Sequence, residues 1–474
     1  MLESVGPMSR ERVAIVIACC VVIIPRLLWW GESPAVIHGD EAGFFAGGIA
    51  EYAHRSPLWS FGPNSLPTAH LWLMGLADAL FGRDVWSGRL VTALFGGLQA
   101  VALVAASARL TGAMGALTTA TVLCLPLELH FERLNMCNVW TTATWSLAFA
   151  VAVLAGWRIW AGALIGALLA LGWYGYQSSR LVPVIVAAPL LVLLVRATRR
   201  QVLVIAAGIL SFLVTLSPLL YGFWLAPQIL LGRGVDTSWI SSTADAAGVR
   251  LHLSGTLAAL SGTGFDQSAF FPYHLPLFPL VVTLLALAGV AAARSLPLAL
   301  VLGVWIGGVV VGNFARNAPI YSCVLICAVP AFAVAAGLTA RFLGVGAPLL
   351  AALAVFPATN AYFEMARSVP PDQSFAMASY RALQGIPHDA PLMIGGGLGC
   401  VHGFTQLHRN CTDLTDENAN APRPPGAYVV LLPDAKSLAD SIPGDREYQE
   451  WYGVEVVVIR TPPSEGMSHP LLKS

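Results

Sequence analysis

Long apolar runs separated by short polar turns dominate the pattern of this chain. A helix needs about 20 apolar residues to cross a hydrocarbon core of about 30 Å, and somewhat fewer when its ends are polar. The runs that meet this condition cover residues 13–30, 86–107, 112–127, 138–156, 160–175, 181–195, 202–220, 277–293, 296–312, 319–339 and 343–360. The pattern predicts an all-α polytopic membrane protein with about 11 transmembrane helices.

Two apolar stretches need a separate interpretation. The run 13–30 follows Arg10 and Arg12, as in a signal peptide, but it lacks a small-residue cleavage site and many more spans follow it. It is therefore interpreted as a retained helix. The stretch 66–81 contains His70 and Asp78, and an interfacial or re-entrant helix suits it better than a span.

The composition changes after residue 360. Strand-like runs at 391–394, 428–432 and 454–459 alternate with Gly, Pro and Asp turn signals, and 374–383 has a helical pattern. We therefore expect a transmembrane domain over 1–360 and a small α/β domain over 361–474. The loop IGGGLGC at 394–400 lacks the GK[ST] ending of a phosphate loop, so it is interpreted as a turn.

The overall composition agrees with a membrane protein and excludes a nucleic-acid-binding one. Hydrophobic residues make up 56% of the chain and charged residues 11%, and the formal net charge is zero. Lysine occurs only at 436 and 473, so no basic tract could neutralise a phosphate backbone. No CxxC pair indicates a metal site. Cys400 and Cys411 lie in the polar tail and could form a disulfide in an oxidising compartment, which the sequence leaves open.

Arginine in alternate short turns indicates the orientation. Short cytoplasmic loops carry an excess of Lys and Arg. With a cytoplasmic N-terminus, every cytoplasmic turn contains arginine, namely Arg109, Arg158, Arg196, Arg199, Arg200, Arg294 and Arg341. An odd number of spans then places the C-terminal domain outside, together with the long segments 31–85 and 221–276.

An acidic pair, Asp40 and Glu41, follows the first span in the sequence VIHGDEAGFF. Asp is a favoured N-cap residue, and acidic groups suit the first turn of a helix. A carboxylate near the lipid headgroups would also have a raised proton affinity, so it could act as a general base. Both interpretations of Asp40 remain open.

Three further external turns carry polar residues. His130, Glu132 and Arg133 lie in LELHFERLNMCNVW, and for His130 an ordinary solvated loop is the simpler interpretation. Arg180 lies in GWYGYQSSRLVP and Arg316 in GNFARNAPIY. External arginines break the charge bias, and a phosphate ligand would explain them. Charges within the spans are nearly absent, which favours an enzyme at the outer surface over a transporter with ionisable groups at the bilayer midplane.

The order of several motifs resembles a known family. HGDE after the first span, HFERLNMCN after the third, YGYQSSRLVP, and FDQSAFFPYHLPLFP before the eighth are similar to bacterial members of the dolichyl-phosphate-mannose protein mannosyltransferases, which also resemble the lipid A aminoarabinose transferases. The likeness covers roughly residues 10–360. It implies a GT-C membrane fold and inverting transfer of a sugar from a polyprenyl-phosphate donor to a protein, lipid or glycan acceptor outside the membrane.

The resemblance also implies roles for particular residues. Asp40 matches the family's base and Glu41 its acidic neighbour. The departing phosphate also needs cations, and the external arginines Arg133, Arg180 and Arg316 are the candidates to bind it. Some relatives carry a second-loop acid near Asn138, whereas the nearest acid here is Glu132; with His130 it is a possible acceptor site. The metal requirement is therefore open. No cofactor is indicated, and the lipid-linked sugar donor is a substrate. A lipid-sugar flippase and a GT-C oligosaccharide transferase or polymerase are the alternatives.

Overall fold

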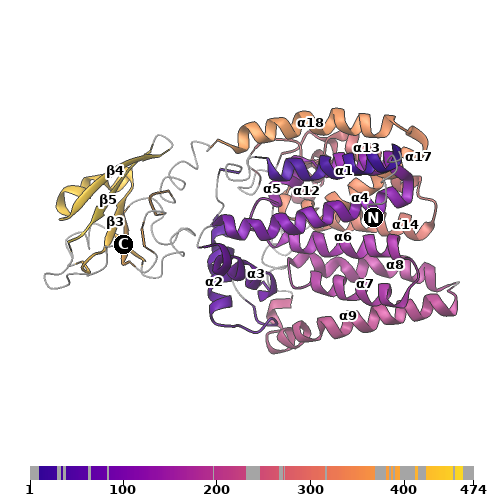
Figure 1. Cartoon of the computed structure of the whole chain (residues 1–474), viewed down its shortest axis with the longest axis horizontal. Coiled ribbons are helices and arrows are strands. Elements are labelled where there is room, and N and C mark those ends of the chain that lie inside the picture. The colour runs from indigo at the N-terminus through magenta and orange to yellow at the C-terminus, as the bar shows by residue number, and fades with distance from the viewer. Residues whose placement is uncertain are drawn as a thin grey trace, which may run out of the picture. The chain divides into compact units, whose positions relative to one another are not determined.

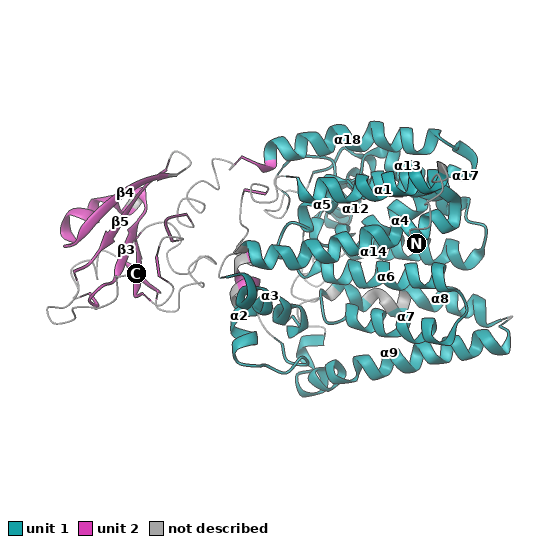
Figure 2. Cartoon of the chain, in the orientation of Figure 1, with its two compact units in different colours: residues 1–33, 47–365 teal, residues 34–46, 366–474 magenta. Residues whose placement is uncertain are grey.

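The computed structural model consists of two compact units, which are coloured separately in Figure 2. One comprises residues 1–33 and 47–365, and the other comprises 34–46 and 366–474. The residues that the structure describes are 10–28, 34–35, 39–61, 66–82, 85–195, 197–230, 246–265, 271, 273–314, 316, 318–368, 381–383, 386–387, 390–395, 411–414, 423–451 and 454–462. The grouping of 34–46 with the C-terminal residues was not indicated by the sequence.

The larger unit is helical (Figure 1). The helices described along the chain are α1 (Arg10–Leu27), α2 (Gly39–Ala53), α3 (Thr68–Phe81), α4 (Val85–Val122), α5 (Pro126–Phe131), α6 (Asn138–Ala155), α7 (Ile159–Gly172), η2 (Gln177–Leu181), α8 (Val182–Leu194), α9 (Arg199–Leu225), α12 (Ala246–Ser261), α13 (Leu280–Ala291), α14 (Leu296–Phe314), α15 (Ser322–Leu325), η3 (Ile326–Ala328), α16 (Val329–Leu338), α17 (Ala340–Leu343) and α18 (Gly346–Ala366).

Six helical segments of the described chain are long and apolar enough to cross a membrane. They are Trp86–Val122, Asn138–Ala155, Arg199–Leu225, Leu296–Phe314, Ser322–Leu343 and Gly346–Ala366. Every predicted run coincides with a helix, but several of these helices are shorter or contain more charges than a span allows, so the number 11 is not confirmed. The multi-pass membrane character is confirmed. In α4 the two predicted runs are joined across Gly112, whose φ of 74° interrupts the helical geometry.

The segment Ser322–Leu343 lies at the centre of the helical unit. Its apolar window is entirely buried by other helices, and α16 packs against α4 and α13. Figure 1 shows α4, α6, α7 and α9 following one another side by side. A helix that is apolar on all sides has no preferred outward face, which agrees with the central position of this segment.

Glycines allow α7 and α9 to pack closely. A Cβ atom added to Gly166 would overlap the carbonyl oxygen of Gly208, and one added to Gly162 would overlap that of Val204. Small residues at such contacts let helix backbones approach each other in a membrane, where apolar burial between helices adds little.

The smaller unit contains a five-stranded sheet of order β2-β1-β3-β5-β4. Its strands are β1 (Leu392–Gly395), β2 (Cys411–Leu414), β3 (Tyr428–Leu431), β4 (Asp445–Trp451) and β5 (Val454–Arg460). β1 pairs in parallel with β2 and β3, whereas β5 is antiparallel to β3 and β4. The core of the sheet includes Val429, Leu431, Val457 and Ile459.

The sheet confirms the three predicted strands and adds two. β2 and β4 have polar sequences, CTDL and DREYQEW, so no apolar alternation indicated them. Cys411 in β2 is disulfide-bonded. Cys400, the loop 396–400 and residues 374–380 of the predicted helix lie outside the described residues.

The close contact of α7 and α9 predicts a position-specific effect of alanine. Gly166→Ala should lower the melting temperature of the purified protein in detergent, since overpacking costs about 1–3 kcal/mol. Gly307→Ala on α14 is the matched control, because a Cβ atom there has no neighbour within 4 Å, and alanine favours a helix by about 1 kcal/mol over glycine. A Gly166→Ala protein as stable as the control would contradict the contact.

Candidate active site

The hinge between α4 and α6, residues 123–137, is buried rather than solvated. His130, Glu132 and Arg133 are each at most 3% exposed. The prediction of an ordinary solvated loop was therefore wrong. The hinge contains the short helix α5 and packs inside the helical unit, where its polar groups must find partners.

A buried ion pair joins this hinge to the first helix. Arg26 of α1 places its Nε 2.7 Å from Oε2 of Glu132, and its Nη2 donates to Oε1 at 2.8 Å. Arg26 also donates to the carbonyls of Val22 at 2.6 Å and Leu123 at 3.3 Å. The side chains of Arg26 and Glu132 are 5% and 1% exposed. Bidentate geometry and additional hydrogen bonds are what a buried ion pair needs to offset its desolvation.

Helix α4 completes the surroundings of Glu132. Gln99 donates to Glu128 and, at 3.2 Å, to Oε1 of Glu132. A Cβ atom added to Gly96 would overlap Cδ of Glu132, so only glycine fits against the carboxylate. Burial raises the pKa of Glu128, which lies on α5 between the spans, and the charge of Glu132 raises it further. We call Arg26, Gln99, Glu128 and Glu132 the hinge cluster.

Arg133 is engaged with the end of the first helix. Its guanidinium donates to the carbonyls of Pro25 and, at 2.6 Å, of Leu28. The guanidinium carbon also lies 4.8 Å from the ring centroid of Phe363. Burial lowers the pKa of Arg133. A cation at the C-terminal end of α1 satisfies carbonyls that have no helical partner and opposes the negative end of the helix dipole.

Aromatic rings surround His130. The rings of Phe131, Phe271, Tyr273 and Tyr362 all meet the imidazole nearly edge-on, at centroid distances of 5.1–5.9 Å. Nδ1 of His130 lies 3.5 Å from the Tyr362 hydroxyl. The imidazole thereby connects the hinge to the residues that precede α13 and to α18.

Arg180 lies in η2, between α7 and α8, and is held by neutral groups. Its guanidinium donates to the carbonyls of Leu230 and, at 3.3 Å, of Ile229, and lies 5.6 Å from the ring centroid of Phe223. No carboxylate of the described residues neutralises it. Burial lowers the pKa of Arg180, and the positive charge of Arg316 lowers it further. The two arginines are therefore close enough to repel each other, and we call them the arginine pair.

Arg316 is positioned by the end of α14. Its backbone N–H donates to the carbonyl of Asn313 at 3.0 Å, and its guanidinium carbon lies 5.7 Å from the ring centroid of Tyr321. The Asn313 side chain in turn accepts from the Tyr321 N–H at 2.8 Å and donates to the Thr256 hydroxyl at 3.0 Å. A single asparagine therefore fixes both ends of the turn that carries Arg316.

Hydrogen bonds also connect the Arg180 segment to the core. The Ser178 hydroxyl lies 3.2 Å from Sγ of Cys327, and the Trp305 indole N–H donates to the Cys327 carbonyl at 2.7 Å. The Tyr176 N–H donates to the Thr141 hydroxyl at 2.8 Å. Helix η2 therefore has a defined position relative to α6 and α14.

The acidic pair lies in the first turn of α2. The helix begins at Gly39, so Asp40 lies one residue inside it. The Asp40 side chain is outside the described residues. Glu41 is fully buried and has an interaction partner. Acidic groups in this turn suit the helix dipole.

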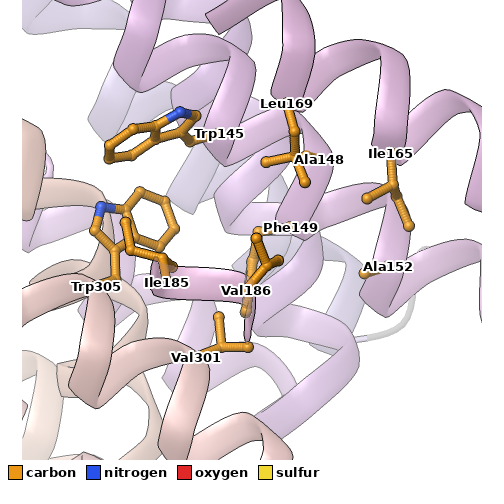
Figure 3. Close-up of a pocket in the computed structure, with 10 residues that line it drawn as sticks. All are labelled: Trp145, Ala148, Phe149, Ala152, Ile165, Leu169, Ile185, Val186, Val301 and Trp305. Carbon is orange, nitrogen blue, oxygen red and sulfur yellow. The ribbon is translucent and has the colours of Figure 1, made fainter. Parts of the chain in front are cut away.

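An apolar groove runs between α7, α8 and α9. It has a volume of about 420 Å³, and Pro183, Leu190, Gly166 and Phe212 are among the residues that line it. A smaller pocket of about 120 Å³ adjoins it, and its lining residues are shown in Figure 3. Because Pro183 follows Arg180 by three residues, the groove begins close to the backbone of Arg180.

The fold has counterparts among solved structures. ArnT from Cupriavidus metallidurans in the apo state aligns with a TM-score of 0.64 and 16% identity, over 95% of this chain and 98% of that one. The same protein bound to undecaprenyl phosphate aligns at 0.63 and 16% identity, over 94% and 97%. The Archaeoglobus fulgidus oligosaccharyltransferase tethered to an acceptor peptide aligns at 0.52 and 14% identity, over 96% and 76%.

The chain has the GT-C fold. The fold implied by the family resemblance is thereby confirmed. No family model matches the chain, and no curated protein sequence matches it. At these identities the likeness to the GT-C structures is one of fold alone.

Of the hinge cluster, sequence reasoning named only Glu132, although two signals for the other residues were present. Arg26 lies inside an apolar run, where a charge needs a partner. Glu128 and Glu132 are four residues apart, so a helical turn would place them on one face. Gln99 could not be identified in this way, because one amide in a long apolar helix indicates no particular partner.

The ion pair predicts that one substitution is more harmful than two. Arg26→Met leaves the Glu132 carboxylate buried without its partner, which should cost about 3–5 kcal/mol. Arg26→Met combined with Glu132→Met removes both charges and should recover much of that loss. Thermal unfolding of the wild type and the two variants in detergent measures the difference. A double variant less stable than Arg26→Met would contradict this account of the hinge.

Proposed function

We propose that the protein is a membrane glycosyltransferase that transfers a monosaccharide from a polyprenyl-phosphate sugar to an acceptor on the extracytoplasmic face. The observation that carries this proposal is Arg180, a partly buried guanidinium that no described carboxylate neutralises and that lies near a second arginine. Buried charges are normally paired, and a phosphate would supply the missing anion. The ArnT structure of the same fold contains undecaprenyl phosphate, which supports this class of donor.

The apolar groove supports a lipid-linked donor rather than a soluble nucleotide sugar. Its walls α7 and α8 meet at the segment that carries Arg180. A polyprenyl tail in the groove would therefore place its phosphate near the arginine pair.

The reaction needs a base for the acceptor and cations for the departing phosphate. In the proposed mechanism, Asp40 takes the proton of the acceptor hydroxyl, and the acceptor oxygen forms a bond to the anomeric carbon. The bond from that carbon to the phosphate oxygen breaks on the opposite face, which inverts the configuration. Polyprenyl phosphate leaves with the electron pair, and Arg180 and Arg316 stabilise its charge. Glu41 would orient the acceptor.

The remaining predicted residues already make contacts within the protein. Arg133 stays a candidate phosphate ligand, but its hydrogen bonds to the end of α1 already give it a structural role. Glu132 and His130 stay candidates for an acceptor site, and each has contacts that hold the hinge. The proposed orientation places the N-terminus in the cytoplasm and the C-terminal domain outside, because arginine marks the alternate short turns.

An assay of the purified protein in lipid tests the proposal directly. The protein is incubated with a panel of polyprenyl-phosphate sugars and cell-envelope extract, and the labelled product is identified by mass. We expect transfer from at least one of these donors and none from nucleotide sugars. Movement of the donor across the membrane without any transfer would instead support a flippase.

The base assignment predicts that Asp40→Asn abolishes transfer. The amide is nearly isosteric but cannot accept the proton, so the rate should fall by about 10²–10⁴-fold. Membrane insertion and the elution volume in size exclusion serve as controls for folding. Full activity of Asp40→Asn would exclude Asp40 as the base.

We predict that substitutions in the arginine pair lower the affinity for the donor. Arg180→Lys keeps the charge but loses the planar fork that matches phosphate, and Arg316→Ala removes a charge. A hydrogen bond to a charged group contributes about 1.5–3 kcal/mol, so the KM for the donor should rise by roughly 10- to 150-fold. The KM for the acceptor should change little. Unchanged donor kinetics in both variants would remove these residues from the phosphate site.

A further inference from the structure

The small pocket between α6, α7, α8 and α14 ends against two tryptophans. The ring centroids of Trp145 and Trp305 lie 5.7 Å apart at an interplanar angle of 75°, and both residues are 3% exposed. Figure 3 shows this pair at one end of the pocket and Ile165 and Ala152 at the other. All ten lining residues are apolar or aromatic, so the pocket suits hydrocarbon rather than water or a sugar.

The pocket adjoins the larger groove. The two cavities have four lining residues in common, namely Ala152, Ile165, Leu169 and Val186. A hydrocarbon chain that lies in the groove along α8 therefore passes directly beside the pocket. The pocket therefore lies where a branch or a bend of such a chain would reach it.

The tryptophan end is also connected to the segment that carries Arg180. Trp305 donates to the carbonyl of Cys327, whose thiol lies 3.2 Å from the hydroxyl of Ser178 in η2. Ile185, which lines the pocket, follows Arg180 by five residues, which corresponds to roughly 8 Å along a helix axis. The pocket is thus within reach of the part of a lipid tail nearest to a phosphate bound at Arg180.

The volume of the pocket matches that of a small hydrocarbon unit. In another protein, a dry apolar cavity of about 150 Å³ accommodates benzene, a molecule of six carbons. The present pocket of about 120 Å³ therefore suits a branched unit of five carbons. It is too small to hold a second such unit.

We infer that this pocket binds one isoprene unit of the donor's tail close to the phosphate, and that Trp145 and Trp305 form the surface that recognises it. The inference rests on the proposed function and specifies how the site distinguishes a polyprenyl carrier from the bulk lipids of the bilayer. The rest of the tail lies in the groove and in the surrounding membrane.

Filling the pocket tests the inference. Ala148→Leu on α6 and Val301→Phe on α14 each place extra carbons into the pocket from a different wall. Leu154→Phe is the matched control, because Leu154 lies on α6 but is 51% exposed and lines neither the pocket nor the groove. Using two walls keeps the test valid if one filled variant fails to fold, as judged by size exclusion.

The binding of undecaprenyl phosphate is measured by native mass spectrometry, together with the KM for a polyprenyl-phosphate sugar. We expect the filled variants to bind at least tenfold more weakly than the wild type, and Leu154→Phe to bind as the wild type does. Wild-type affinity in a folded filled variant overturns the pocket assignment and leaves the proposed function intact. A wild-type protein that neither binds the carrier nor transfers a sugar overturns both. An equal loss of phosphatidylglycerol binding in the filled variants shows a site for bilayer lipid and also overturns the assignment.

Discussion

The buried ion pair between Arg26 and Glu132 is the interaction on which the arrangement of the α4–α6 hinge depends. Each charge would be costly alone inside the helical unit, so the two residues fix α1 and the hinge against each other. On α4, Gln99 donates a hydrogen bond to the Glu132 carboxylate, and the missing side chain of Gly96 leaves space for it. Three segments that are distant in the sequence are thereby held together by one set of polar groups.

Buried polar groups need partners, and this need also explains the positions of Arg133 and His130. Pro25 lies near the end of α1, and Arg133 supplies hydrogen bonds to the carbonyls of this region. His130 adds contacts to the aromatic residues of α18 and of the segment before α13. The hinge is therefore held by contacts within the protein that involve no ligand, and such contacts are a suitable support for a binding site.

The apolar pattern predicted most of the helical fold, because a membrane imposes a length and a composition on each span. It could not predict that residues 123–137 would be buried, since a polar turn between spans has the same sequence character whether it faces water or a protein interior. Of the site residues, Arg180 and Arg316 could be proposed from the external positions that the arginine pattern predicts for them. Their proximity could not be predicted, because it depends on how the turns before α8 and after α14 approach in three dimensions.

The polar strands β2 and β4 were missed for a related reason: their pairing partners, rather than their own composition, make them strands.

The interaction partners of each arginine show whether it has a structural role or is a candidate for ligand binding. Its position in the sequence distinguishes these two cases less clearly. Arg26 and Arg133 are both buried. Arg26 pairs with the Glu132 carboxylate and Arg133 with carbonyls at the end of α1, so both charges have partners within the protein. Arg180 is held by neutral carbonyls and an aromatic ring, and the charge of Arg316 repels it. Holding a cation in such surroundings raises the free energy of the unliganded protein, and an anionic ligand would recover that free energy on binding. The apolar groove that begins three residues beyond Arg180 would suit the hydrocarbon tail of the proposed donor.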